Sequence, residues 1–152
     1  MPRNKAAAPV THTDVILPMQ EPYMTQIVDS QKNYEFRKYC LEPSVKRIWF
    51  YCTAPHSSIA HIYGTLPAYT RNAVNSPLSE GGLKNKDFNE RHKDWEDYDF
   101  AYKITSVFEL YKELTLAELS SIYGLKSAPR GLVYLPKTIS QEITWNKQKK
   151  IR

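Results

Sequence analysis

Hydrophobic residues occur along this chain in short segments whose spacing predicts strands more often than helices. Residues 45–53 are almost continuously apolar and rich in β-branched and aromatic side chains, which predicts a central strand covered on both faces. Residues 59–69 form a second β-rich segment, interrupted by Gly64 and Pro67, which suggest a bulge or bend. Further strands are predicted at residues 14–17, 98–110 and 131–135.

Helical spacing appears in three segments. Pro22 stands at the first turn of one of them, where its missing N–H costs nothing. Thr115 and Glu118 form a capping box, and Gly124 ends the helix that follows. The three predicted helices are residues 22–29, 87–97 and 116–123. The resulting order, β-α-β-β-β-α-β-α-β, has too few crossover helices for a doubly wound sheet, so we expect an α+β fold.

A polar strand motif follows the first predicted helix, at residues 32–37. Side chains in a strand alternate between faces, so Tyr34 and Phe36 should point one way while Glu35 and Arg37 point the other. A carboxylate and a guanidinium on one face can share hydrogen bonds or bind a polar ligand together. Lys32 stands at the entrance of this strand. The alternative is that Glu35 and Arg37 form a purely structural ion pair.

Length and composition favour one domain with an ordinary core. The chain has 152 residues, of which 41% are hydrophobic and 24% charged. No apolar run approaches the roughly 18 residues that span a bilayer, and no apolar signal region opens the chain, so we expect an intracellular protein, cytoplasmic or nuclear. Cys40 and Cys52 match no metal motif and are expected to be free thiols. The histidines lack partners at metal-ligand spacing, and we expect no metal and no cofactor.

The positive charge is concentrated at the ends of the chain. The formal net charge of the chain is +5. Between the two ends, basic and acidic residues are nearly equal in number. We divide the chain into a flexible arm at residues 1–13, a domain at 14–136 and a basic C-terminal tail at 137–152. Residues 71–85 are either a surface loop or a lid. The basic residues at the two ends are Arg3, Lys5, Lys147, Lys149, Lys150 and Arg152.

The order of these motifs resembles the ASCH family, a branch of the PUA-like superfamily of small barrels. The resemblance covers about residues 14–136 and implies a small mixed β-barrel of five or six strands with about three flanking helices. It departs from the family at Ser30, where a glycine is usual. The residues that carry the resemblance are Lys32, Glu35, Arg37, Tyr51, Thr53, Pro55 and the turn Ser127-Ala128-Pro129-Arg130 before the last strand.

The resemblance also bears on chemistry. Similar ASCH proteins, the bacterial acetylcytidine amidohydrolases, place a threonine nucleophile where this chain has Glu35, so we expect no threonine-type acyl intermediate. The candidate ligand-binding residues are Lys32, Glu35, Arg37, Tyr51, Thr53 and Arg130. For Tyr51 and Thr53 the alternative is core packing, and for Arg130 it is a solvated turn.

These observations support three functional hypotheses. The first is a PUA-like domain that binds RNA or a modified nucleobase or nucleoside. The second is a small hydrolase, of amidohydrolase or ribonuclease type, that acts on an acylated nucleoside or on RNA. In that enzyme Glu35 would be the general base and Lys32 would stabilise the oxyanion. The third is an interaction domain that uses the basic ends. The expected partner is RNA or a nucleotide-like small molecule, with no membrane, and the oligomeric state stays open.

Overall fold

A computed structural model describes residues 9–21, 24–25, 33–70, 78, 82–89 and 99–152. Strands dominate this part of the chain, and the helices are short. The strands are β1 (Val10–Met19), β2 (Tyr34–Arg37), β3 (Arg47–Cys52), β4 (Ser58–Thr65), β5 (Tyr69–Thr70), β6 (Phe100–Thr115), β7 (Val133–Pro136) and β8 (Lys149–Lys150). The helices are α2 (Asn85–Asn89), α3 (Leu116–Ser121), α4 (Lys137–Glu142) and the 3-10 helix η2 (Trp145–Lys147).

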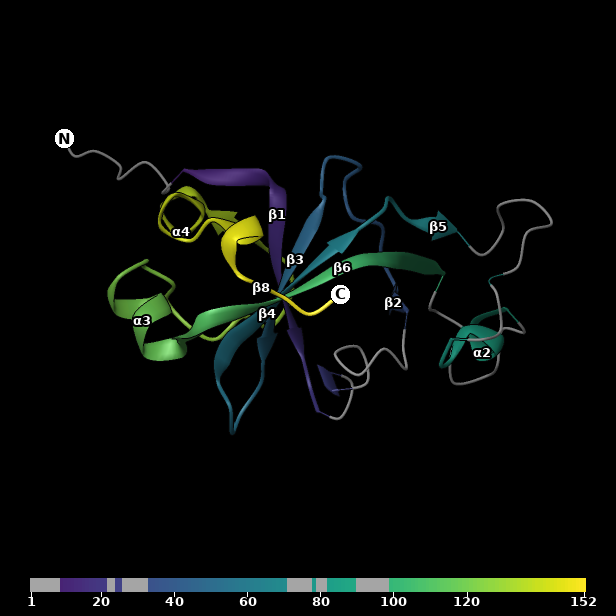
Figure 1. Cartoon of the computed structure of the whole chain (residues 1–152), viewed down its shortest axis with the longest axis horizontal. Helices are drawn as coiled ribbons and strands as arrows, with labels where there is room; N and C mark the ends of the chain where they lie inside the picture. The colour runs from purple at the N-terminus through teal and green to yellow at the C-terminus, as the bar shows by residue number, and fades with distance from the viewer. Residues whose placement is uncertain (1–8, 22–23, 26–32, 71–77, 79–81, 90–98) are drawn as a thin grey trace.

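The strands form one mixed sheet of eight strands. Along its main path the order is β2-β6-β4-β3-β1-β7, while β5 and β8 pair with β6 outside this path. β1 and β3 are parallel, and their other pairings are antiparallel. The strand β6 follows the long axis of the molecule, with α3 and α4 at one end and α2 at the other (Figure 1).

The sheet is open in the part of the chain that the structure describes, so the expected closed barrel of five or six strands is not confirmed. The reason lies in β6, whose two halves have different partners. Residues 100–103 pair with β2 and β5, whereas residues 104–115 pair with β4 and β8. The sheet therefore divides along β6, and its two ends, β2 and β7, are not paired with each other in the described strands.

The central strand prediction is confirmed. β3 lies between β4 and β1, and five of its six residues are buried. Its side chains alternate between two clusters: Ile48 and Phe50 pack with Val15 and Tyr63, whereas Trp49 and Tyr51 enter a second cluster. A strand with apolar side chains on both faces is what a doubly covered position requires.

Two of the predicted helix features can be compared with the structure. The capping box is present, because Thr115 Oγ1 accepts from the Glu118 N–H at 3.2 Å and Glu118 accepts from the Thr115 N–H at 3.1 Å. Gly124 follows α3 with a φ of 79°, a conformation that favours glycine. Most of the helix predicted at residues 22–29, and residues 90–97 of the second, lie outside the described residues.

Residues 137–152 are part of the fold. Ile139 of α4 is fully buried, and the Lys137 N–H donates to the Pro9 carbonyl at 3.0 Å. Further on, the Ile151 N–H donates to Val107 of β6 at 2.8 Å. The sheet likewise begins at Val10, four residues before the predicted start. The folded region therefore extends beyond the predicted domain at both ends.

Candidate functional site

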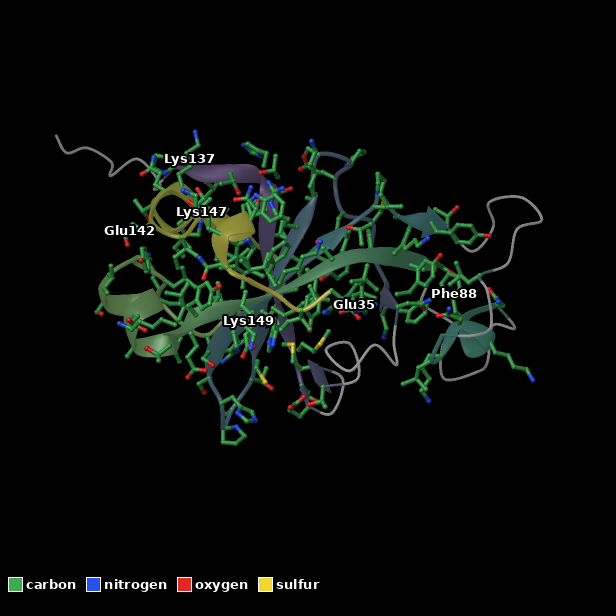
Figure 2. The ribbon with its side chains drawn as sticks, in the orientation of Figure 1. Glu35, Phe88, Lys137, Glu142, Lys147 and Lys149 are labelled. Atoms are coloured by element: carbon green, nitrogen blue, oxygen red, sulfur yellow. The ribbon has the colours of Figure 1, made fainter. Side chains whose placement is uncertain are left out.

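The alternation predicted for residues 34–37 is present in β2. Phe36 packs with Phe88 of α2, their ring centroids 5.2 Å apart, in a small third cluster. On the other face, Arg37 Nη2 lies 2.9 Å from Glu35 Oε2. The carboxylate is almost completely buried, at 3% exposure, and the guanidinium side chain is 19% exposed. Figure 2 shows Glu35 near the middle of the molecule and Phe88 towards the α2 end.

Arg37 also connects β2 to the main sheet. Its Nη2 donates to the Pro18 carbonyl of β1 at 3.1 Å, and its guanidinium carbon lies 5.9 Å from the centre of the Phe50 ring. The Arg37 Nε is buried and has no hydrogen-bond partner among the described residues. A buried donor without a partner costs free energy, so this N–H is a position at which a ligand acceptor would be favourable. We refer to Glu35 and Arg37 together as the Glu35–Arg37 site.

Tyr63 of β4 lies beside this pair. Its ring packs on Phe50 at 4.7 Å between centroids, and its hydroxyl donates to Met24 Sδ at 2.9 Å. Burial raises the pKa of Tyr63 far above its usual value, and the negative charge of Glu35 raises it further, while Arg152 acts in the opposite direction. The Tyr63 phenol is therefore a neutral donor throughout the physiological range.

Two further reactive side chains lie on the neighbouring strands. Burial raises the pKa of the Cys52 thiol, and the nearby Glu21 charge contributes in the same direction. Burial lowers the pKa of the His61 imidazole, which the charges of Glu109 and Glu21 oppose. His61 Nδ1 is buried, and no described residue forms a hydrogen bond with it. Both cysteines are free, as the sequence predicted.

The remaining predicted site residues are not gathered at this pair. Tyr51 is buried in the second cluster, on the face of β3 opposite Phe50, because adjacent strand residues point to opposite sides. Thr53 is partly buried beyond the end of β3, and its N–H donates to Met19 at 3.1 Å. Arg130 is exposed in the loop before β7, at the other end of the strand order from β2. Lys32 lies outside the described residues.

Sequence reasoning did not select Tyr63, His61 and Arg152 for this site. One signal was available, since His61 and Tyr63 are polar residues two apart in an apolar strand. The approach of Tyr63 to Glu35 depends on the pairing of β4 with β6, which is irregular between Ile59 and His61. A bulge shifts the register, and therefore the facing, of later residues in a way that alternation cannot predict.

The fold is that of ASCH domain proteins. The crystal structure of ASCH from Zymomonas mobilis superposes with a TM-score of 0.63 at 19% identity, covering 87% of this chain and 94% of that one. A serine-to-alanine mutant of the Zymomonas mobilis protein gives 0.61 at 20% identity over 88% and 95%. A tyrosine-to-phenylalanine mutant gives 0.60 at 20% identity over 86% and 95%. The sequence matches no family model and no curated protein.

No group of three or more histidine, cysteine or acidic side chains among the described residues is placed to hold a metal ion. No helix in the described ranges is long and apolar enough to cross a membrane.

Proposed function

We propose that this chain binds RNA, or a modified nucleobase or nucleoside, at the Glu35–Arg37 site. The observation that carries the proposal is the buried Arg37 Nε, which has no hydrogen-bond partner in the described part of the chain and lies beside an almost completely buried carboxylate. Leaving such a donor unsatisfied costs about 1–3 kcal/mol, which a ligand carbonyl would recover. The ASCH fold supports the proposal at the level of architecture.

The chemistry of the pair suits the edge of a base. The Glu35 carboxylate can accept a hydrogen bond from a ring or exocyclic N–H, since a carboxylate accepts several bonds at once. Arg37 Nε would donate to an adjacent carbonyl of the same ligand. Nucleobases carry donors and acceptors side by side on their edges. An acceptor beside a donor therefore favours a base-like ligand over a purely apolar one.

The test is the substitution Glu35→Gln, which keeps the shape but replaces a charged acceptor. Calorimetry would measure binding of cytidine, an acetylated cytidine and a short single-stranded RNA. We expect the affinity of the bound ligand to fall by about tenfold to a hundredfold, which corresponds to about 1–3 kcal/mol. Glu113→Gln, the same change at an exposed position on β6, is the control and should leave affinity unchanged.

Two results would contradict the proposal. One is saturable binding that Glu35→Gln leaves intact while it lowers thermal stability, because Glu35 would then be a structural ion-pair partner only. The other is the absence of saturable binding for all three ligands with the unmodified protein. Melting curves of both variants distinguish loss of a ligand contact from loss of the fold.

A hydrolase is the second candidate function, and His61 is the observation that favours it. Its lowered pKa keeps the imidazole neutral at pH 7 and able to accept a proton. In this alternative Glu35 or His61 would activate water towards an acylated nucleoside or RNA, with Lys32 stabilising the oxyanion. Chromatography for deacylated or cleaved product tests it directly. Mass spectrometry should show no acyl adduct, because no threonine stands at position 35.

A further inference from the structure

A hollow lies on the sheet around Gly64, apart from the Glu35–Arg37 site. It has a volume of about 340 Å³, at the lower end of the range for small-molecule sites. Gly64 is one of the lining residues and is paired with Arg47 of β3 on one side and with Ser106 of β6 on the other. The side chains that give the Gly64 hollow its polar and aromatic walls are Lys46, Arg47, Thr65, Thr105, Ser106 and Trp145.

Because Gly64 has no side chain, there is room for two hydroxyl groups at this position. A Cβ on Gly64 would lie 2.4 Å from Ser106 Oγ and 2.9 Å from Thr105 Oγ1. The pairing of β4 with β6 is irregular here, because Gly64 faces Ser106 whereas Thr65 faces Ile104. Thr105 is therefore the extra residue of a bulge, and it and Ser106 reach the hollow together instead of alternating.

The walls supply hydrogen-bond donors that the protein does not use. The hydroxyls of Thr65, Thr105 and Ser106 make no hydrogen bond to any described residue. Lys46 is exposed and forms no ion pair within the described chain. Arg47 directs Nε and Nη2 to Asp14, both at 2.9 Å. The guanidinium Nη1 takes no part in this pairing with Asp14.

The rest of the hollow is apolar and contains no carboxylate. The Arg47 guanidinium carbon lies 4.6 Å from the centre of the Trp145 ring, so the cation and the indole form one wall. Pro43, Val45, Leu66 and Pro67 complete the lining. Asp14 is not part of the lining, and its carboxylate also accepts the indole N–H of Trp49 at 2.8 Å. The charge offered to a ligand is therefore positive.

We propose that the Gly64 hollow binds the phosphate group of a phosphate ester. Phosphate oxygens accept from hydroxyl, ammonium and guanidinium donors. The hollow holds three hydroxyl groups, one ammonium group and one guanidinium group. The apolar wall suits the carbon skeleton that carries the phosphate. Two sources offer this chemistry, a free phosphomonoester and the phosphodiester backbone of RNA.

The test is a proton–nitrogen NMR titration of the full chain with ribose 5-phosphate, inorganic phosphate and a short oligoribonucleotide without terminal phosphates. Trp145→Phe identifies the Trp145 indole signal among the three tryptophans of the chain. We expect saturable shifts at that indole and at the Gly64 and Ser106 amides. Shifts with ribose 5-phosphate identify a free monoester as the source, and shifts with the oligonucleotide alone identify the RNA backbone.

Matched variants separate this site from a general effect of charge. Lys46→Gln should weaken binding about tenfold, as expected for loss of a hydrogen bond to a charged group. Lys126→Gln, which removes one exposed lysine in the loop between α3 and β7, should not. Glu113→Gln, at an exposed position on β6, should also leave the affinity unchanged. Equal affinities for Lys46→Gln and the unmodified chain, or no saturable shift at the three reporters with any probe, would overturn the proposal.

Discussion

The pKa of the His61 imidazole is subject to opposing influences. Burial lowers its pKa from 6.5, while the charges of Glu109 and Glu21 favour the protonated form. Glu109 is in turn 4.0 Å from Lys149. Because burial is the largest of these effects, the folded protein holds the imidazole neutral at a pH where the unfolded chain begins to protonate it.

The stability of the protein should therefore depend on pH through His61. The unfolded state binds more protons below about pH 6.5, so stability is complete above that pH and decreases as the pH falls. Urea unfolding at pH 7.5 and 5.5 measures the difference, which His61→Gln should reduce. His56→Gln, at an exposed loop position, should retain it. An undiminished pH dependence in His61→Gln would show that other groups are responsible.

Some features of individual residues could be predicted from the sequence, and others could not. The facing of Glu35 and Arg37 followed from alternation within four residues, a purely local property. The contact of Arg37 with Pro18 spans 19 positions and depends on how β1 is placed against β2. Such long-range placement is a property of the assembled sheet. Tyr51 illustrates the same limit, since its residue type suited a binding wall but its position in β3 puts it in the core.

At the scale of elements, α3 depends on its N-terminal cap. Thr115→Ala removes the hydroxyl that accepts from the Glu118 N–H, and we expect the free energy of unfolding to fall by about 1 kcal/mol. Chemical denaturation measures the change. Thr138→Ala, at an exposed position inside α4 with no cap role, should have a smaller effect. A larger loss at Thr138 than at Thr115 would contradict the role of the cap.

Elements with a local chemical signature were the ones that the sequence predicted well. The capping box and Gly124 fixed both ends of α3, and the apolar run at residues 45–53 identified β3 as central. The length of β6 was underestimated, because Tyr111, Lys112 and Glu113 are exposed and give no apolar signal. These residues are held in the strand through its continuation towards Leu114 and Thr115, which pair with β4.

The whole molecule presents lysines on its C-terminal segment. Figure 2 labels Lys137, Lys147 and Lys149, which lie along that segment. Because the segment is folded, deleting it would confuse loss of charge with loss of structure. Substitution of its exposed lysines is the better test of nonspecific RNA binding.

We expect the triple variant Lys147→Gln, Lys149→Gln and Lys150→Gln to bind single-stranded RNA more weakly. The slope of the logarithm of affinity against that of salt should become shallower by up to about 2, or about 0.7 per charge. Filter binding at several salt concentrations measures this slope. A triple variant at Lys103, Lys112 and Lys126, all exposed elsewhere, is the control. Equal slopes for the two triple variants would show that the salt dependence of RNA binding does not depend on where the positive charges lie.

The many partners of β6 also determine the order in which the chain can fold. This strand meets β2 and β4, which precede it by tens of residues, and β8, which follows it by about forty. Every one of these pairings must close a long loop before it gains any hydrogen bond. Folding should therefore take milliseconds to seconds rather than microseconds. Until β6 forms, β4 has β3 as its partner and β2 has none among the described strands, and their unpaired edges are open to other chains.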